Sequence, residues 1–153
     1  LSERAEGGFS REVLSHFVFV LQRALGQATV EESRPDYPAD GIGSERALKA
    51  RLSAGGLPVA IEARVDGSHP DFNRMTLVGS VGALEIHDWF GVRRRRDAGE
   101  WIPVGTPREN RQIGQSAQLD QLVAMVEGRA HTLPSFAEAL SVQETIEVLL
   151  KGR

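Results

Sequence analysis

Glu12 and His16 are the residues whose types and spacing could do chemistry. They lie four positions apart in a segment with helical periodicity, so their side chains would stand on one face of a helix. A carboxylate beside an imidazole favours the protonated ring and can orient it, and histidine titrates near neutral pH. Such a histidine could take the proton from a hydroxyl group whose carbon is being oxidised. The same spacing is also typical of an ordinary surface pair, so the pattern alone leaves both interpretations open.

The helix that would carry this pair is expected over residues 10–25, with Gly26 as a favourable residue for its C-terminus. Arg11 and Ser15 share a neighbouring stripe of this helix and could line a pocket beside the pair. The apolar stripe of the helix comprises Val13, Phe17, Val20 and Leu21, widened by Leu14 and Val18.

A β-rich region follows, after a short strand expected near residues 28–32 and a loop that runs to residue 43. Alternating apolar and polar residues predict strands over 48–54 and 59–65, and the Gly55-Gly56 pair predicts a hairpin turn between them. The remaining strands are expected over 74–79, 83–89, 90–96 and 101–104, with turns at Val81-Gly82 and Asp97-Ala98-Gly99.

Two helices are expected to close the chain, over residues 117–127 and 135–150. The second begins with a capping box formed by Ser135 and Glu138. The order of one helix, five to seven strands and two helices predicts an α+β fold, in which helices cover one face of an open-faced, mostly antiparallel β-sheet. We interpret residues 1–153 as a single domain with this two-layer sandwich. The first of the two helices carries an apolar face of Leu119, Leu122, Val123 and Val126.

The other face of the predicted sheet would be polar. Such a face is either solvated or forms an interface between two copies of the chain, since open sheets often pair about a two-fold axis. Its expected members are Lys49, Arg51, Glu62, Arg64, Arg74, Thr76, Glu85 and His87.

The composition excludes several classes of function. The chain has 153 residues and a net charge of −3, which gives no reason to expect a nucleic-acid or membrane partner. It has no cysteine, which excludes disulfides and thiol chemistry and fits a cytoplasmic protein. The longest apolar run, residues 17–21, is too short to cross a bilayer. The chain lacks an initiating Met and opens on a polar stretch, so we interpret it as a fragment that starts inside a longer protein.

Other conspicuous residues carry weaker signals. The histidines His69, His87 and His131 are not spaced as metal ligands. The run of four arginines from Arg93 to Arg96 would place two side chains on each face of a strand, which favours a solvated or salt-bridged edge strand over a nucleic-acid site. Both tryptophans, Trp89 and Trp101, are expected to pack on the sheet.

Three motifs, in order, resemble the C-terminal domain of the Gfo/Idh/MocA-type oxidoreductases, the glucose–fructose oxidoreductase and inositol dehydrogenase family. The first is Gly7-Gly8 followed by Glu12 and His16, where the family more often has aspartate at the acidic position. The second is the Gly-x-x-Gly hairpin at residues 79–86. The third is the opening of the last helix at residues 134–143. Together the three motifs cover most of the chain.

The resemblance implies roles for these residues. His16 would be the catalytic histidine, and Glu12, Arg11 and Ser15 would bind the substrate. The substrate would be a sugar, a polyol or a related small hydroxyl compound, and the parent protein would use NAD or NADP and form homo-oligomers. This chain has neither a Gly-x-Gly-x-x-Gly fingerprint nor the family's Glu-Lys-Pro segment.

We therefore expect the nucleotide-binding domain to be absent and the fragment to bind no cofactor and to be inactive alone. The alternative is a non-enzymatic binding or dimerisation module with the same fold.

Overall fold

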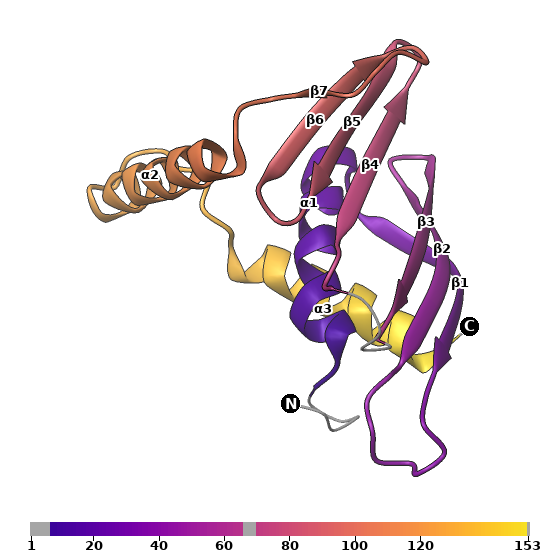
Figure 1. The fold of residues 1–153 in the computed structure, drawn as a ribbon. Helices are drawn as coiled ribbons and strands as arrows, with labels where there is room; N and C mark the ends of the chain where they lie inside the picture. The colour runs from indigo at the N-terminus through magenta and orange to yellow at the C-terminus, as the bar shows by residue number, and fades with distance from the viewer. Residues whose placement is uncertain (1–6, 66–69, 153) are drawn as a thin grey trace. The chain divides into compact units, whose positions relative to one another are not determined.

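The computed structural model describes residues 7–65 and 70–152, which form two compact units (Figure 1). The first unit takes in residues up to 65 together with those from 134 onward, and the second comprises residues 70–133. Each unit combines antiparallel strands with helix, so the predicted α+β class is confirmed. The interpretation of residues 1–153 as one domain stays a prediction.

The first unit is a three-stranded antiparallel sheet covered on one face by helices. The strand order is β1-β2-β3, and α3 runs along β1 while α1 packs on α3. The elements are the π-helical turn η1 (Ser10–Leu14), α1 (Ser15–Leu25), β1 (Ala28–Asp36), β2 (Ala47–Ala54), β3 (Leu57–Arg64) and α3 (Phe136–Lys151).

The core of this unit lies between β2 and the two helices. Leu48 and Leu52 alternate with exposed polar residues along β2 and are fully buried, as are Ile146 and Leu149 of α3 and Val18 of α1. Burial of these side chains supplies most of the driving force that holds the helices on the sheet, at about 1.5–3 kcal/mol for each. The period-two pattern of the sequence therefore predicts the correct inner face of β2.

The outer face of this sheet is polar, as expected. Lys49, Arg51, Glu62 and Arg64 are all exposed, and the ammonium of Lys49 lies 3.0 Å from the carboxylate of its cross-strand neighbour Glu62. Opposite charges at directly paired positions stabilise a sheet modestly.

The second unit contains a four-stranded antiparallel sheet and one long helix. The strand order is β4-β5-β6-β7. The elements are β4 (Arg74–Gly79), β5 (Gly82–His87), β6 (Gly91–Arg96), β7 (Ile102–Pro103) and α2 (Pro107–Val126). The strands therefore belong to two separately hydrogen-bonded sheets within the described residues, where the sequence suggested one. Alternation of residue types locates strands but does not reveal which strands exchange hydrogen bonds.

Glu85 is not part of a solvated polar face. The residue is only 3% exposed. The carboxylate accepts hydrogen bonds from Arg93, at 2.7 Å, and from the hydroxyl of Thr76, at 3.1 Å. The guanidinium of Arg93 also lies over the ring of Trp101, so Glu85, Arg93 and Trp101 form a local cluster on this face of the second sheet.

Two elements are longer than expected. Strand β1 continues to Asp36 through Pro35, which an edge strand tolerates because its outward N–H needs no partner. Helix α2 begins ten residues before the predicted start, because Thr106 and Glu109 form a capping box with Pro107 at the first helical position. The first half of this helix has few apolar residues, so apolar periodicity does not predict it.

The apolar face of α2 is exposed. Its only buried residue in the described part of the chain is Ala124, whereas Leu119, Leu122, Val123 and Val126 are open to solvent. None of the described helices is long and apolar enough to traverse a bilayer.

Candidate functional site

The helix that carries Glu12 and His16 runs over residues 10–25, as predicted, but its first turn is π-helical. The backbone N–H of Ser15 donates to the carbonyl of Ser10, five residues earlier. Single π-turns inside helices are rare and are frequently found at functional sites. Both Glu12 and His16 are exposed, whereas Leu14 and Val18 face the core. The acid and the histidine are therefore on the outer side of this helix.

The start of this helix is held by a carboxylate from a distant loop. The backbone N–H of Ser10 donates to Glu45 Oε1 at 2.7 Å, and Glu45 is only 3% exposed. A negative charge at a helix N-terminus is favourable because the first N–H groups have no partner within the helix. Gly8 makes room for it: at its φ of +107°, a Cβ atom would lie 2.3 Å from Glu45 Oε2. Sequence reasoning missed Glu45, since 35 residues separate it from Ser10.

A hollow of about 470 Å³ lies beside this helix start. It brings together carboxylates of Glu12 and Asp40 and the guanidinium of Arg46, which together offer acceptors and donors to a hydroxyl-rich molecule. His16 is not among the lining residues. These are Gly8, Phe9, Glu12, Val13, Pro38, Asp40, Gly43, Ser44, Glu45, Arg46 and Val65.

Asp40 organises the loop that forms one wall of the hollow. Its Oδ1 accepts from the backbone N–H groups of Ile42, at 2.9 Å, and Gly43, at 2.8 Å. These two hydrogen bonds favour the ionised form and lower the pKa of Asp40. The amides of Ile42 and Gly43 therefore bind a side chain of this chain and are not available to a phosphate group.

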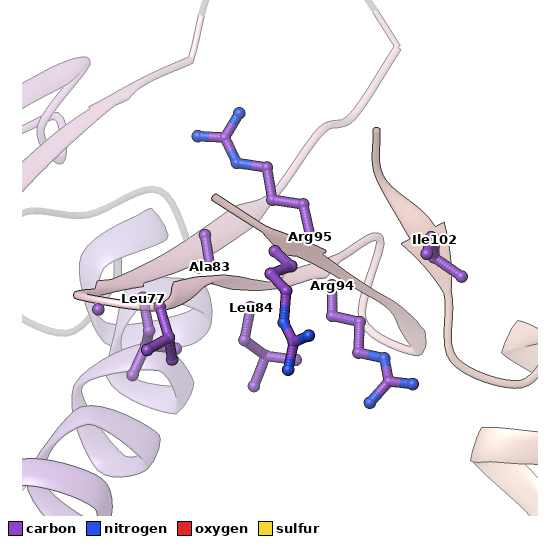
Figure 2. A pocket seen from close by; sticks show the side chains of 10 residues that line it. Leu77, Ala83, Leu84, Arg94, Arg95 and Ile102 are labelled. Carbon is purple, nitrogen blue, oxygen red and sulfur yellow. The ribbon is translucent and has the colours of Figure 1, made fainter. Parts of the chain in front are cut away.

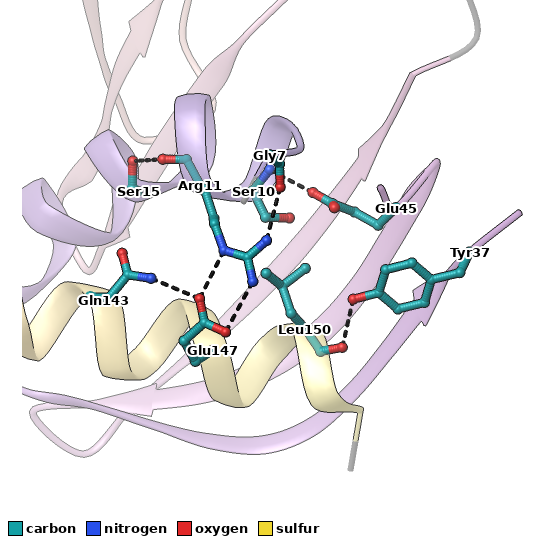
Figure 3. Close-up of polar contacts among 9 residues, drawn as sticks. All are labelled: Gly7, Ser10, Arg11, Ser15, Tyr37, Glu45, Gln143, Glu147 and Leu150. Carbon is teal, nitrogen blue, oxygen red and sulfur yellow. Dashed lines mark hydrogen bonds and ion pairs between the residues drawn. The ribbon is translucent and has the colours of Figure 1, made fainter. Parts of the chain in front are cut away.

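Arg11 binds α3. Its Nε and one terminal nitrogen donate to the two carboxylate oxygens of Glu147, at 2.8 and 3.0 Å, and the other terminal nitrogen donates to the carbonyl of Gly7 at 2.9 Å (Figure 3). Gln143 donates to the same carboxylate at 2.7 Å. This bidentate ion pair raises the pKa of Arg11 and lowers that of Glu147. The guanidinium therefore positions the first helix on α3.

Ser15 makes a local contact. Its hydroxyl donates to the carbonyl of Arg11, four residues earlier, at 2.7 Å, and its side chain is partly buried (Figure 3). A hydroxyl bonded back to its own helix is a common arrangement that often bends the helix slightly. Of the four predicted site residues, Glu12 and His16 are thus exposed, and Arg11 and Ser15 are bound within the first unit.

The contribution of the Arg11–Glu147 pair to stability is expected to be lost in acid. A carboxyl whose pKa is lowered in the folded state stabilises the protein above its unfolded-state pKa, and loses that contribution as the pH falls through the folded-state value. Glu147→Gln is therefore expected to lower the free energy of unfolding at pH 7 by about 1 kcal/mol or less, because the pair is partly exposed. Below about pH 4 the difference from the unsubstituted chain is expected to shrink.

Urea unfolding between pH 3 and 7 measures this difference. Glu144→Gln is the matched control, because it removes an exposed carboxylate from the same helix without changing the contact with Arg11. A gap between Glu147→Gln and the unsubstituted chain that widens on acidification would contradict the assignment.

Two of the other histidines, His87 and His131, belong to the second unit. His87 belongs to β5, and its Nδ1 lies 3.0 Å from Asp88 Oδ2. His131 is exposed in the segment before α3, and His69 lies outside the described residues. Within the described ranges, no cluster of three or more histidine, aspartate or glutamate side chains could hold a metal ion.

Two solved structures have the same arrangement of elements. The dehydrogenase MviM from Clostridium difficile superposes with a TM-score of 0.69 at 7% identity, covering 91% of this chain and 46% of that protein. An oxidoreductase from Thermotoga maritima superposes with a TM-score of 0.61 at 18% identity, covering 95% of this chain and 42% of that protein. The chain shares its fold with both. It spans less than half the length of either one.

This likeness confirms the resemblance at the level of the fold, which the chain shares with a dehydrogenase and an oxidoreductase. A scan against protein-family models finds no match. A search of the curated proteins also finds no similar sequence. At such low identities the likeness concerns the fold, and the chemistry must be argued from the side chains.

Proposed function

We propose that this chain is the substrate-side domain of an NAD(P)-dependent oxidoreductase that acts on a sugar, a polyol or a related hydroxyl compound. The main support for the proposal is that Glu12 and His16 are both exposed on one helix, whose start borders a polar hollow. The fold is also shared with a dehydrogenase and an oxidoreductase.

In this proposal His16 is the catalytic base. It would accept the proton of a substrate hydroxyl while the attached carbon is oxidised. Glu12 lines the hollow and would accept a hydrogen bond from a second hydroxyl of the substrate. Substrate contacts from Arg11 and Ser15 would be made through the outer edges of side chains already bound to Glu147 and to the helix backbone.

In this proposal the chain itself binds no nicotinamide dinucleotide. The amides of Ile42 and Gly43 are bound to Asp40, and the sequence contains no Gly-x-Gly-x-x-Gly fingerprint. NAD or NADP would be held by a nucleotide-binding domain elsewhere in the parent protein. We propose that the parent protein is cytoplasmic and that the chain by itself is inactive.

The outer face of the β1-β2-β3 sheet would join two copies of the protein. Its exposed charges include both signs, and Arg51 pairs with Glu32 of the neighbouring strand. Mixed charge of this kind is compatible with a self-complementary interface about a two-fold axis.

The test is a screen of the complete parent protein against polyols and sugars with NAD and with NADP, alongside the isolated chain. Reduction of a cofactor by the parent protein, with no cofactor binding or turnover by the isolated chain, is the expected result. Turnover by the isolated chain would contradict the proposal that a separate nucleotide-binding domain is needed for activity. Adjoining coding sequence without a glycine-rich fingerprint and a Glu-Lys-Pro segment would favour the alternative, a non-enzymatic binding or dimerisation module.

A further inference from the structure

A second hollow, of about 740 Å³, lies on the β4-β5-β6-β7 sheet of the second unit. Its floor is apolar: Leu77, Leu84 and Ile102 come from β4, β5 and β7, and Leu84 and Ile102 are exposed. This volume is within the range of small-molecule sites in proteins.

Three arginines of β6 line this hollow, and two of them, Arg94 and Arg96, share the side of its apolar floor. Figure 2 shows Arg94 on the same side of the sheet as Leu77 and Leu84, whereas Arg95 and Ala83 project to the other side. Arg96 shares the side of Arg94 because side chains alternate along a strand. Residues two apart on a strand lie about 6.8 Å from each other, so both guanidiniums can reach one anionic group.

Neither of these guanidiniums forms an ion pair with a described residue. Arg93, one residue away, is paired with the buried Glu85. Across residues 7–65 and 70–152, no carboxylate forms an ion pair with Arg94 or Arg96, and none lines the hollow. In the described part of the chain, two arginines without an ion-pair partner therefore lie over an apolar floor, although the net charge of the chain is −3.

Protection of a strand edge does not explain this arrangement. Charged residues on edge strands prevent unwanted pairing, and β7 is too short to pair with β6 beyond Arg94. Arg94 itself is an interior position, with Leu84 on one side and Ile102 on the other. Protection of a strand edge therefore does not account for the charge of Arg94, whose two cross-strand neighbours are apolar.

A recess lies next to Arg96. Its cross-strand partner is Gly82, so no side chain fills that position of the sheet. Gly82 has a φ of +150°, and a Cβ there would lie 2.2 Å from the carbonyl oxygen of Arg95. The backbone therefore requires glycine at this position, and the space beside the guanidinium of Arg96 stays open.

We propose that this hollow binds a small amphiphilic anion, a carboxylate or phosphate attached to an apolar body. The anionic group would lie between Arg94 and Arg96, which present planar donors suited to both oxyanions. The apolar body would cover Leu77, Leu84 and Ile102. The hollow belongs to the second unit, whereas the helix that carries His16 belongs to the first. The inference does not depend on the proposed oxidoreductase activity.

Isothermal titration calorimetry with octanoate tests the proposal on the chain of residues 1–153. Saturable binding is expected, together with much weaker binding of acetate, which lacks the apolar body, and of octanol, which lacks the charge. The double variant Arg94→Gln/Arg96→Gln is expected to weaken binding of octanoate by at least about tenfold. Leu84→Ser is expected to weaken it several-fold through loss of apolar contact.

The matched control is Arg108→Gln/Arg111→Gln, which removes two charges from the same unit away from the hollow and is expected to bind octanoate as the unsubstituted chain does. The proposal fails if octanoate does not bind saturably, if the Arg94/Arg96 variant binds within twofold of the control, or if octanol binds as tightly as octanoate. Binding to phosphatidylglycerol vesicles without binding of monomeric octanoate would show that the charged patch recognises a membrane surface, and would also overturn it.

Discussion

Replacing His16 with alanine in the complete parent protein is expected to lower the kcat of the proposed oxidation by about 10²- to 10⁴-fold, the contribution usually made by a positioned general base. The imidazole is exposed on the helix beside the polar hollow, so its removal takes away the proton acceptor without opening a cavity in the core. The free energy of unfolding is therefore expected to change little. Steady-state rates across a range of pH, compared with urea unfolding of the same variant, measure both effects.

His131→Ala is the control for this substitution. It removes an exposed histidine from the segment before α3, outside the proposed site, and is expected to leave kcat within about twofold of the unsubstituted enzyme. If His16→Ala retained comparable activity, His16 would not be the base. A loss of activity that only followed a loss of folded protein would point to a structural role.

Ile146→Ala is expected to lower the free energy of unfolding of the first unit by about 2–5 kcal/mol, because it leaves a cavity where a fully buried side chain joins α3 to the sheet. Far-ultraviolet circular dichroism during urea unfolding is the suitable measurement. Tryptophan fluorescence is not suitable, since Trp89 and Trp101 both lie in the second unit.

Val148→Ala is the matched control on the same helix. Val148 is 39% exposed, so its truncation removes little buried area and is expected to cost less than about 1 kcal/mol. Equal destabilisation by the two substitutions would show that α3 does not contribute its Ile146 face to the core.

Local patterns in the sequence predicted much of the fold. The helix over residues 10–25, the hairpin around Gly55-Gly56 and the capping box at Ser135 are all observed. Each depends on residues within a few positions of one another, through side-chain periodicity, turn geometry or a cap. For the same reason α2 was predicted too short: its start depends on the capping box at Thr106, and its first turns carry few apolar residues.

The surroundings of the candidate site were decided by contacts between distant residues. The sequence alone indicated that Glu12 and His16 share a helix face, because four-residue spacing is enough for that inference. It could not indicate that Glu45 caps the helix, that Glu147 binds Arg11 or that Glu85 is buried beneath Arg93. A carboxylate has the same local pattern whether it is solvated or paired, and only the folded chain brings its partner within hydrogen-bonding distance.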